Sequence, residues 1–208
     1  MFFYSFLLIA HLQAIILPIS IGFISLNKFK HLNNSSLIPF GFFSIGIASL
    51  FELFDHTQTE WIYINHSSIF NWLFYSFLSL GLTLLSISVI KNKNLTYINL
   101  IICFLAIISY WLIGKPIALG FQVLVSIILI ISWQKKFKDW LFIAYPIFGI
   151  FLTTFFGIKL TLTANQLWHV FIGPSGSISV LTFYIVLVNS KNKLKKYKLQ
   201  NSNHNFHI

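Results

Sequence analysis

The stretch IALGFQVLVSIILIISW, residues 117–133, contains no charged side chain and no proline. An α-helix of this length crosses about 30 Å of hydrocarbon, the core of a bilayer. Further apolar runs of comparable length occur on both sides of it, at residues 2–26, 37–54, 69–90, 95–113, 140–158 and 166–188. Together they predict an all-α polytopic membrane protein, a seven-transmembrane-helix bundle spanning residues 1–188. Residues 189–208 then form a basic tail, which we expect to be flexible.

The composition agrees with this fold class. Of 208 residues, 57% are hydrophobic and 9% are charged, whereas about 25% of a soluble domain is charged. The single cysteine, Cys103, excludes an intramolecular disulfide. The loops between the apolar runs are short, so the chain has no room for a separate soluble domain.

The distribution of lysine gives the orientation. All fourteen basic residues are lysines, and twelve of them fall in the first, third and fifth loops and in the tail; only Lys115 and Lys159 lie on the other side. The positive-inside rule therefore predicts an N-terminus outside and a C-terminus in the cytoplasm. The net charge of +10 is explained by this asymmetry, so we expect membrane lipids as partners and no nucleic acid.

Acidic, histidine and amide side chains gather on the predicted outer side. Glu52, Asp55 and His56 end the second run, and Asn165 and His169 begin the seventh. Ionisable groups at membrane depth are costly, so they indicate a functional site. Residues three and four apart share a helix face, so two facing helices would bring these five side chains into one pocket.

This combination is typical of a catalytic zinc site. Two histidines and a carboxylate leave one metal position open for water, and zinc makes that water nucleophilic at neutral pH. We therefore expect His56, His169 and Asp55 to bind zinc, Glu52 to act as general base, and Asn165 to orient water or substrate. A second interpretation has Asp55 and His56 facing interfacial water at the helix end. The roles of three other polar side chains stay open: His11, Glu60 and His66.

A short motif in the seventh run resembles a known family. The run Asn165-Gln-Leu-Trp168-His169 with Gly173 is similar to the last-helix signature of alkaline ceramidases and the wider CREST superfamily of seven-helix membrane hydrolases. The family pattern is His-x-x-Trp-His with a glycine four residues later; here Asn165 replaces the first histidine. His56 matches the family's histidine on the second helix, with Glu52 at its serine position. The resemblance implies a metal-dependent intramembrane hydrolase that cleaves a lipid amide or ester near the outer face.

Two other classes of function stay open. One is a non-enzymatic membrane protein (a receptor, small carrier or assembly factor) with a pocket of acidic and histidine residues. Few polar residues occur in the cytoplasmic halves of the helices, so the sequence shows no continuous path for an ion. The other is a b-type haem protein in which His56 and His169 are the axial ligands. The short loops and the lack of targeting features favour the bacterial inner membrane; the oligomeric state is open.

Overall fold

The computed structural model describes residues 2–30, 32, 34–58, 69–139 and 176–192. Within these ranges the regular structure is entirely helical. Five helices follow one another along the chain: α1 (Phe2–Lys28), α2 (Leu37–Gln58), α3 (Ile69–Ile87), α4 (Lys93–Leu112) and α5 (Lys115–Phe137). Residues 176–192 form a further helical segment. All five named helices are long and apolar enough to cross a membrane, as the sequence predicts; the sixth predicted span, residues 140–158, lies outside the described residues.

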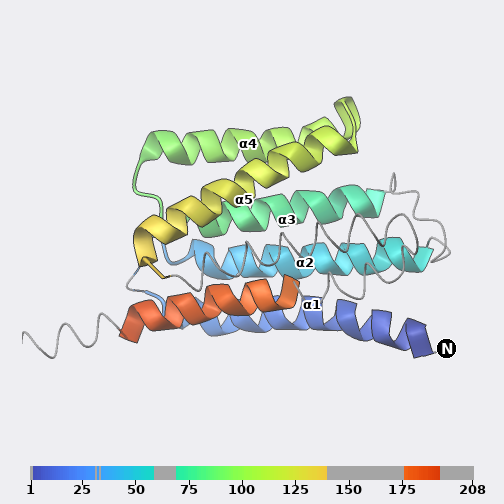
Figure 1. Ribbon diagram of the computed structural model, residues 1–208, viewed down its shortest axis with the longest axis horizontal. Coiled ribbons are helices and arrows are strands. Elements are labelled where there is room, and N and C mark those ends of the chain that lie inside the picture. The colour runs from blue at the N-terminus through green and yellow to red at the C-terminus, as the bar shows by residue number, and fades with distance from the viewer. Residues whose placement is uncertain (1, 31, 33, 59–68, 140–175, 193–208) are drawn as a thin grey trace, which may run out of the picture.

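The helices lie side by side as an antiparallel bundle (Figure 1). Extensive contacts join α1 to α2, α2 to α3, and α4 to α5, and α3 also contacts both α4 and α5. The segment 176–192 runs alongside α1. Helix α3 is therefore the element that connects the α1–α2 pair to the α4–α5 hairpin.

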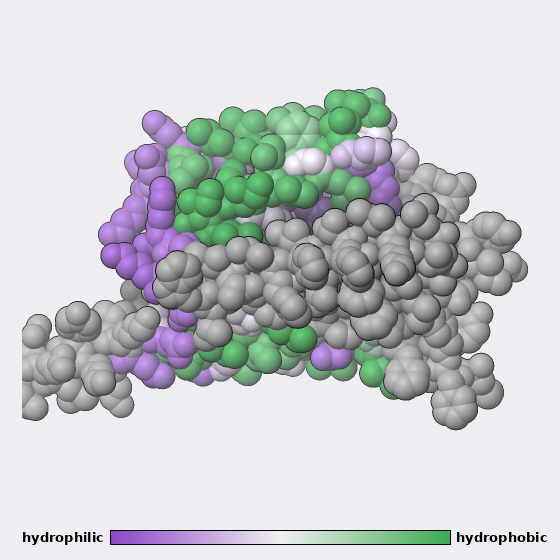
Figure 2. Space-filling view, in the orientation of Figure 1, coloured by the Kyte–Doolittle hydropathy of each residue, from purple (hydrophilic) through white to green (hydrophobic). Residues whose placement is uncertain are grey.

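The lysines mark one end of this bundle, called here the lysine end. It comprises the end of α1, the α3–α4 connection and the end of α5, with Lys28, Lys30, Lys91, Lys93, Lys135, Lys136 and Lys138. In Figure 2 the hydrophilic colour concentrates at this end, and a hydrophobic surface covers α4 and α5 beside it. Large exposed apolar side chains of α4 and α5 include Ile101, Phe104 and Leu124. This arrangement fits a bilayer around the bundle with the lysine end in the cytoplasm.

Local sequence explains where α4 and α5 begin. The Asn92 side chain accepts hydrogen bonds from the backbone N–H groups of Asn94 (2.9 Å) and Leu95 (3.3 Å), a normal N-cap for α4. Gly114 joins α4 to α5 with φ of 127°, a conformation that a residue with a Cβ rarely adopts. Pro116 follows in the first turn of α5, where a missing N–H is harmless.

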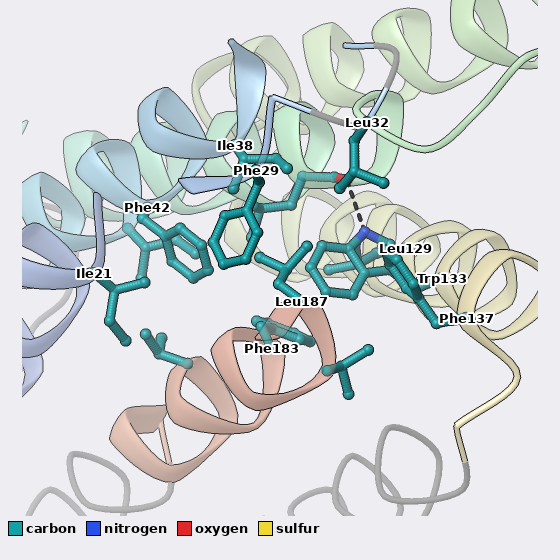
Figure 3. Packing of buried hydrophobic residues seen from close by; sticks show 14 residues of the cluster. Ile21, Phe29, Leu32, Ile38, Phe42, Leu129, Trp133, Phe137, Phe183 and Leu187 are labelled. Carbon is teal, nitrogen blue, oxygen red and sulfur yellow. Dashed lines mark hydrogen bonds between the residues drawn. The ribbon is translucent and has the colours of Figure 1, made fainter. Parts of the chain in front are cut away.

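The hydrophobic core lies toward the lysine end, where residues of the α1–α2 connection pack against the helices. Figure 3 shows Trp133 of α5 among Phe29, Leu129 and Leu187, which come from different parts of the chain. The Trp133 Nε1–H donates to the carbonyl oxygen of Leu85 at 2.7 Å. This hydrogen bond fixes α5 against the end of α3 inside an otherwise apolar cluster.

We expect Trp133→Phe to lower the free energy of unfolding by about 2 kcal/mol, because it removes a buried hydrogen bond worth about 1 kcal/mol and leaves a cavity where the fully buried indole was. Tyr97→Phe is the control, since Tyr97 is 62% exposed and its replacement should change stability by less than about 0.5 kcal/mol. Chemical denaturation in detergent measures both values. Equal stabilities for the two variants would show that the Trp133 bond contributes nothing.

Candidate functional site

The two carboxylates of α2 lie at the end of the bundle opposite the lysines, called here the carboxylate end. Glu52 and Asp55 are three residues apart in α2 and interact electrostatically. Asp55 is buried, with 2% of its surface exposed. The interpretation in which Asp55 faces interfacial water is therefore wrong, because its carboxyl group points into the bundle.

Asp55 belongs to a hydrogen-bonded relay across three helices. The Asn71 Nδ2 of α3 donates to Asp55 Oδ2 at 3.3 Å, and the Tyr110 hydroxyl of α4 donates to Asn71 Oδ1 at 2.8 Å. All three side chains are buried. The Asn71 amide thus donates to one neighbour and accepts from the other, which fixes its orientation and ties α2, α3 and α4 together.

Aromatic rings pack around the relay on α3 and α4. The Trp72 Nε1–H donates to the backbone carbonyl of Ile107 at 3.0 Å, a second polar link between these helices. Three ring pairs continue the contact: Tyr75–Tyr110, Tyr110–Trp111 and Trp72–Trp111, with centroids 5.5–6.3 Å apart. These distances suit favourable aromatic pairs. The rings of Tyr75 and Trp111 therefore fix the Tyr110 ring, and with it the position of the Tyr110 hydroxyl.

Lys115, the first residue of α5, supplies a positive charge to the same region. Its Nζ lies 5.1 Å from the centroid of the Tyr75 ring, within cation–π range. It is also attracted electrostatically by Asp55 and Glu52. A cation beside two carboxyl groups offsets the cost of placing them in a region of low dielectric. We define the polar cluster as Glu52, Asp55, Asn71, Tyr75, Tyr110 and Lys115, which come from α2, α3, α4 and α5.

The predicted zinc and catalytic residues are only partly described. Glu52 and Asp55 belong to the polar cluster, and His56 continues α2, but its side chain is outside the described part of the structure, as are Asn165 and His169. Among the residues that are described, no three histidine, cysteine or acidic side chains could hold a metal together. Zinc binding by His56, His169 and Asp55 therefore stays a prediction, as do the roles given to Glu52 and Asn165.

Sequence reasoning gave no site role to four members of the cluster: Asn71, Tyr75, Tyr110 and Lys115. In the sequence, Lys115 serves only as one of two lysines on the outer side, and the tyrosines look like ordinary residues near helix ends. Their positions near the ends of α3, α4 and α5 on the same side of the membrane were the available signal. Which of them face Asp55 depends on how each helix is rotated, and the sequence does not specify that rotation.

Comparison with known proteins decides the family. The family model 7TM_cyano, described as a seven transmembrane receptor, matches residues 3–193. The chain belongs to this seven transmembrane receptor family. The match covers nearly all of the chain and supports a multi-pass membrane protein with seven helices. No match was found among curated proteins or among solved structures.

The receptor family overturns the ceramidase interpretation. That resemblance rested on Trp168, His169 and Gly173 in one short motif, whereas the receptor model matches residues 3–193. A Trp-His pair arises readily in an apolar, aromatic-rich helix. The two substitutions at the ceramidase motif, Asn165 for histidine and Glu52 for serine, are departures at the positions that define that family's site. The inferred lipid hydrolase is therefore wrong, and the non-enzymatic alternative is favoured.

The family description also ranks the remaining alternatives. It favours a receptor over a small carrier or an assembly factor. The haem interpretation needs the same two histidines as the zinc site, so the described residues do not test it.

Proposed function

We propose that this protein is a receptor of the bacterial inner membrane and that the polar cluster at the carboxylate end responds to its stimulus. The family description carries the proposal, and the family name, 7TM_cyano, supports the assignment to bacteria. The multi-pass topology is that of the family and of the five apolar helices.

The polar cluster has the properties that a responsive element needs. A stimulus shifts a receptor only if it interacts differently with two conformations. The cluster joins four helices through the Asn71–Asp55 and Tyr110–Asn71 hydrogen bonds and the Lys115–Tyr75 cation–π contact. A change of charge or of hydrogen bonding there alters the contacts of α2, α3, α4 and α5 at once.

The other end of α3 leads to the lysine end. There the Leu85 carbonyl accepts from Trp133 of α5, and the Ile87 carbonyl accepts from Asn34 Nδ2 at 3.2 Å. Lys28 of α1 donates to the Tyr184 hydroxyl in the segment 176–192 at 2.5 Å. Helix α3 therefore makes hydrogen bonds at both ends of the bundle. A shift of α3 that follows a change in the polar cluster also changes its hydrogen bonds on the cytoplasmic side.

The test is hydrogen–deuterium exchange of the full chain in lipid nanodiscs. Asp55→Asn keeps the shape of the side chain and removes its charge. We expect faster exchange both near Asn71 and, far from the substitution, in the α3–α4 connection and at the end of α5. A receptor requires this remote effect, because its two ends must be coupled.

Ile69→Val is the matched control, because Ile69 is 57% exposed at the start of α3, close to Asn71 in sequence. It should leave exchange at the lysine end unchanged. If Asp55→Asn alters exchange only around the substitution, the two ends are uncoupled and the proposed role of the cluster is refuted.

A further inference from the structure

One face of α3 carries small polar side chains along most of its length. Ser76, Ser79, Thr83 and Ser86 follow one another at intervals of three or four residues, so they share a face. All four are buried. Trp72 lies on the same face, and its indole donates to the backbone of α4. The polar face of α3 is therefore turned toward α4.

Helix α4 also has a buried face of small and polar residues. Asn99, Cys103, Ala106 and Ser109 recur at the same intervals, and all are buried. Small residues on both sides let two membrane helices approach closely. They also leave few large apolar groups to fill the space between the helices.

Two contacts give the register of the antiparallel pair. Tyr110 bonds to Asn71 near the carboxylate end, and the Cys103 thiol lies against the Thr83 hydroxyl further along. Asn99 lies one turn beyond Cys103, and Ser86 lies one turn beyond Thr83. The two faces therefore meet from the polar cluster to the level of Asn99 and Ser86, and we call this contact the α3–α4 seam.

The polar atoms of the seam are not satisfied by one another. Within the described residues, no hydrogen bond is made by the hydroxyls of Ser76, Ser79, Ser86 and Ser109 or by either polar atom of the Asn99 amide, and the Thr83 hydroxyl has only the Cys103 thiol beside it. Asn99 is 0% exposed. Buried polar groups in native proteins nearly always have partners, and unmatched ones indicate a bound molecule. In hydrocarbon the penalty is larger still, because lipid offers no hydrogen bonds.

We propose that the α3–α4 seam binds a row of water molecules that runs from the polar cluster toward the lysine end. Water matches the donor set, because the hydroxyls and the Asn99 amide each donate and accept, and the seam residues carry no charge that would select an ion. Buried waters typically make about three hydrogen bonds each, which neighbouring hydroxyls on facing helices can supply. The row gives α4 exchangeable links to α3, so α4 can shift relative to α3 without losing hydrogen bonds.

X-ray radiolytic labelling of the full chain in nanodiscs tests this proposal. Hydroxyl radicals form from water and oxidise the side chains beside it, and the lone Cys103 is a reactive reporter inside the seam. We expect Cys103 to be oxidised although it is buried, and the rate to fall several-fold in Asn99→Leu. Asn94→Leu is the matched control; Asn94 is exposed in the first turn of α4, so the rate should equal that of wild type.

Thermal unfolding gives an independent result. Leucine has nearly the shape of asparagine, so in a dry seam Asn99→Leu removes two unmatched polar atoms and raises Tm. In a hydrated seam the same change removes water-mediated bonds and lowers Tm. If the Asn99→Leu protein does not fold, Thr83→Val replaces it: Tm should rise if the seam is dry and fall if it is hydrated. A raised Tm, or absence of Cys103 oxidation in wild type, would overturn the proposal.

Discussion

Asn71→Leu is expected to lower the free energy of unfolding by about 2.5–4 kcal/mol. The substitution removes the amide that donates to the Asp55 carboxyl group and accepts from the Tyr110 hydroxyl. A hydrogen bond to a carboxylate contributes about 1.5–3 kcal/mol and a neutral one about 1 kcal/mol. Chemical denaturation in detergent, followed by circular dichroism, measures the loss.

A double-mutant cycle sharpens this prediction. Tyr110→Phe alone should cost about 1 kcal/mol, because it removes one neutral hydrogen bond. Adding it to Asn71→Leu should cost less than it does in the wild-type background, since the Asn71 amide that accepts from the hydroxyl is already gone. Asn94→Leu serves as the exposed control. Full additivity of the two buried substitutions would mean that the relay does not act as a unit.

Gly81→Ala is the second change with a large expected effect, at the crossing of α2 and α3. A Cβ atom on Gly81 would lie 2.8 Å from the Gly41 carbonyl oxygen and 3.1 Å from the Ile45 backbone nitrogen. These are backbone atoms, so no side-chain rotation relieves the contact and the two helices must separate. We expect a loss of about 2–3 kcal/mol, the upper part of the range for overpacking.

Gly120→Ala is the matched control for this prediction. Gly120 lies within α5, and a Cβ atom there would meet nothing within 4 Å. Alanine favours helix over glycine by about 1 kcal/mol, so this variant should be equal to wild type or more stable. A Gly81→Ala protein as stable as Gly120→Ala would show that α2 and α3 are not in close backbone contact.

The helices followed from hydropathy, but their ends did not. The prediction for the third span reached residue 90, whereas α3 ends at Ile87. Beyond it Val89 and Ile90 bond to carbonyls only three residues back, and Ser88 Oγ donates to the Leu85 carbonyl. Apolar residues continue through this turn, so a hydropathy profile does not register it. In the other direction, α5 extends past Trp133 to Phe137 because lysines are good helix formers.

The location of the polar cluster could be predicted from the sequence, but most of its members could not. The cost of ionisable groups at membrane depth pointed to Glu52 and Asp55, and both belong to the polar cluster. The sequence also shows that the cytoplasmic halves of the helices carry few polar residues. What it does not show is that three of these few, Thr83, Ser86 and Asn99, are fully buried. Serine and threonine change the mean hydropathy of a helix little. Their spacing places them on one face, but which neighbouring helix that face meets emerges only when the helices are packed.

The dependence of the α4–α5 hairpin on α3 bears on biogenesis. The hairpin contacts α3 on both of its helices, and α3 faces it with hydroxyls and Asn71. A newly inserted hairpin that has not yet met α3 would present the Asn99 amide to acyl chains. Such an intermediate is costly in lipid, so the third span should reach the bilayer before the fourth and fifth leave the insertion machinery. Fragments that contain α1–α3 and end before α4 should then insert stably, whereas the α4–α5 hairpin expressed alone should be degraded.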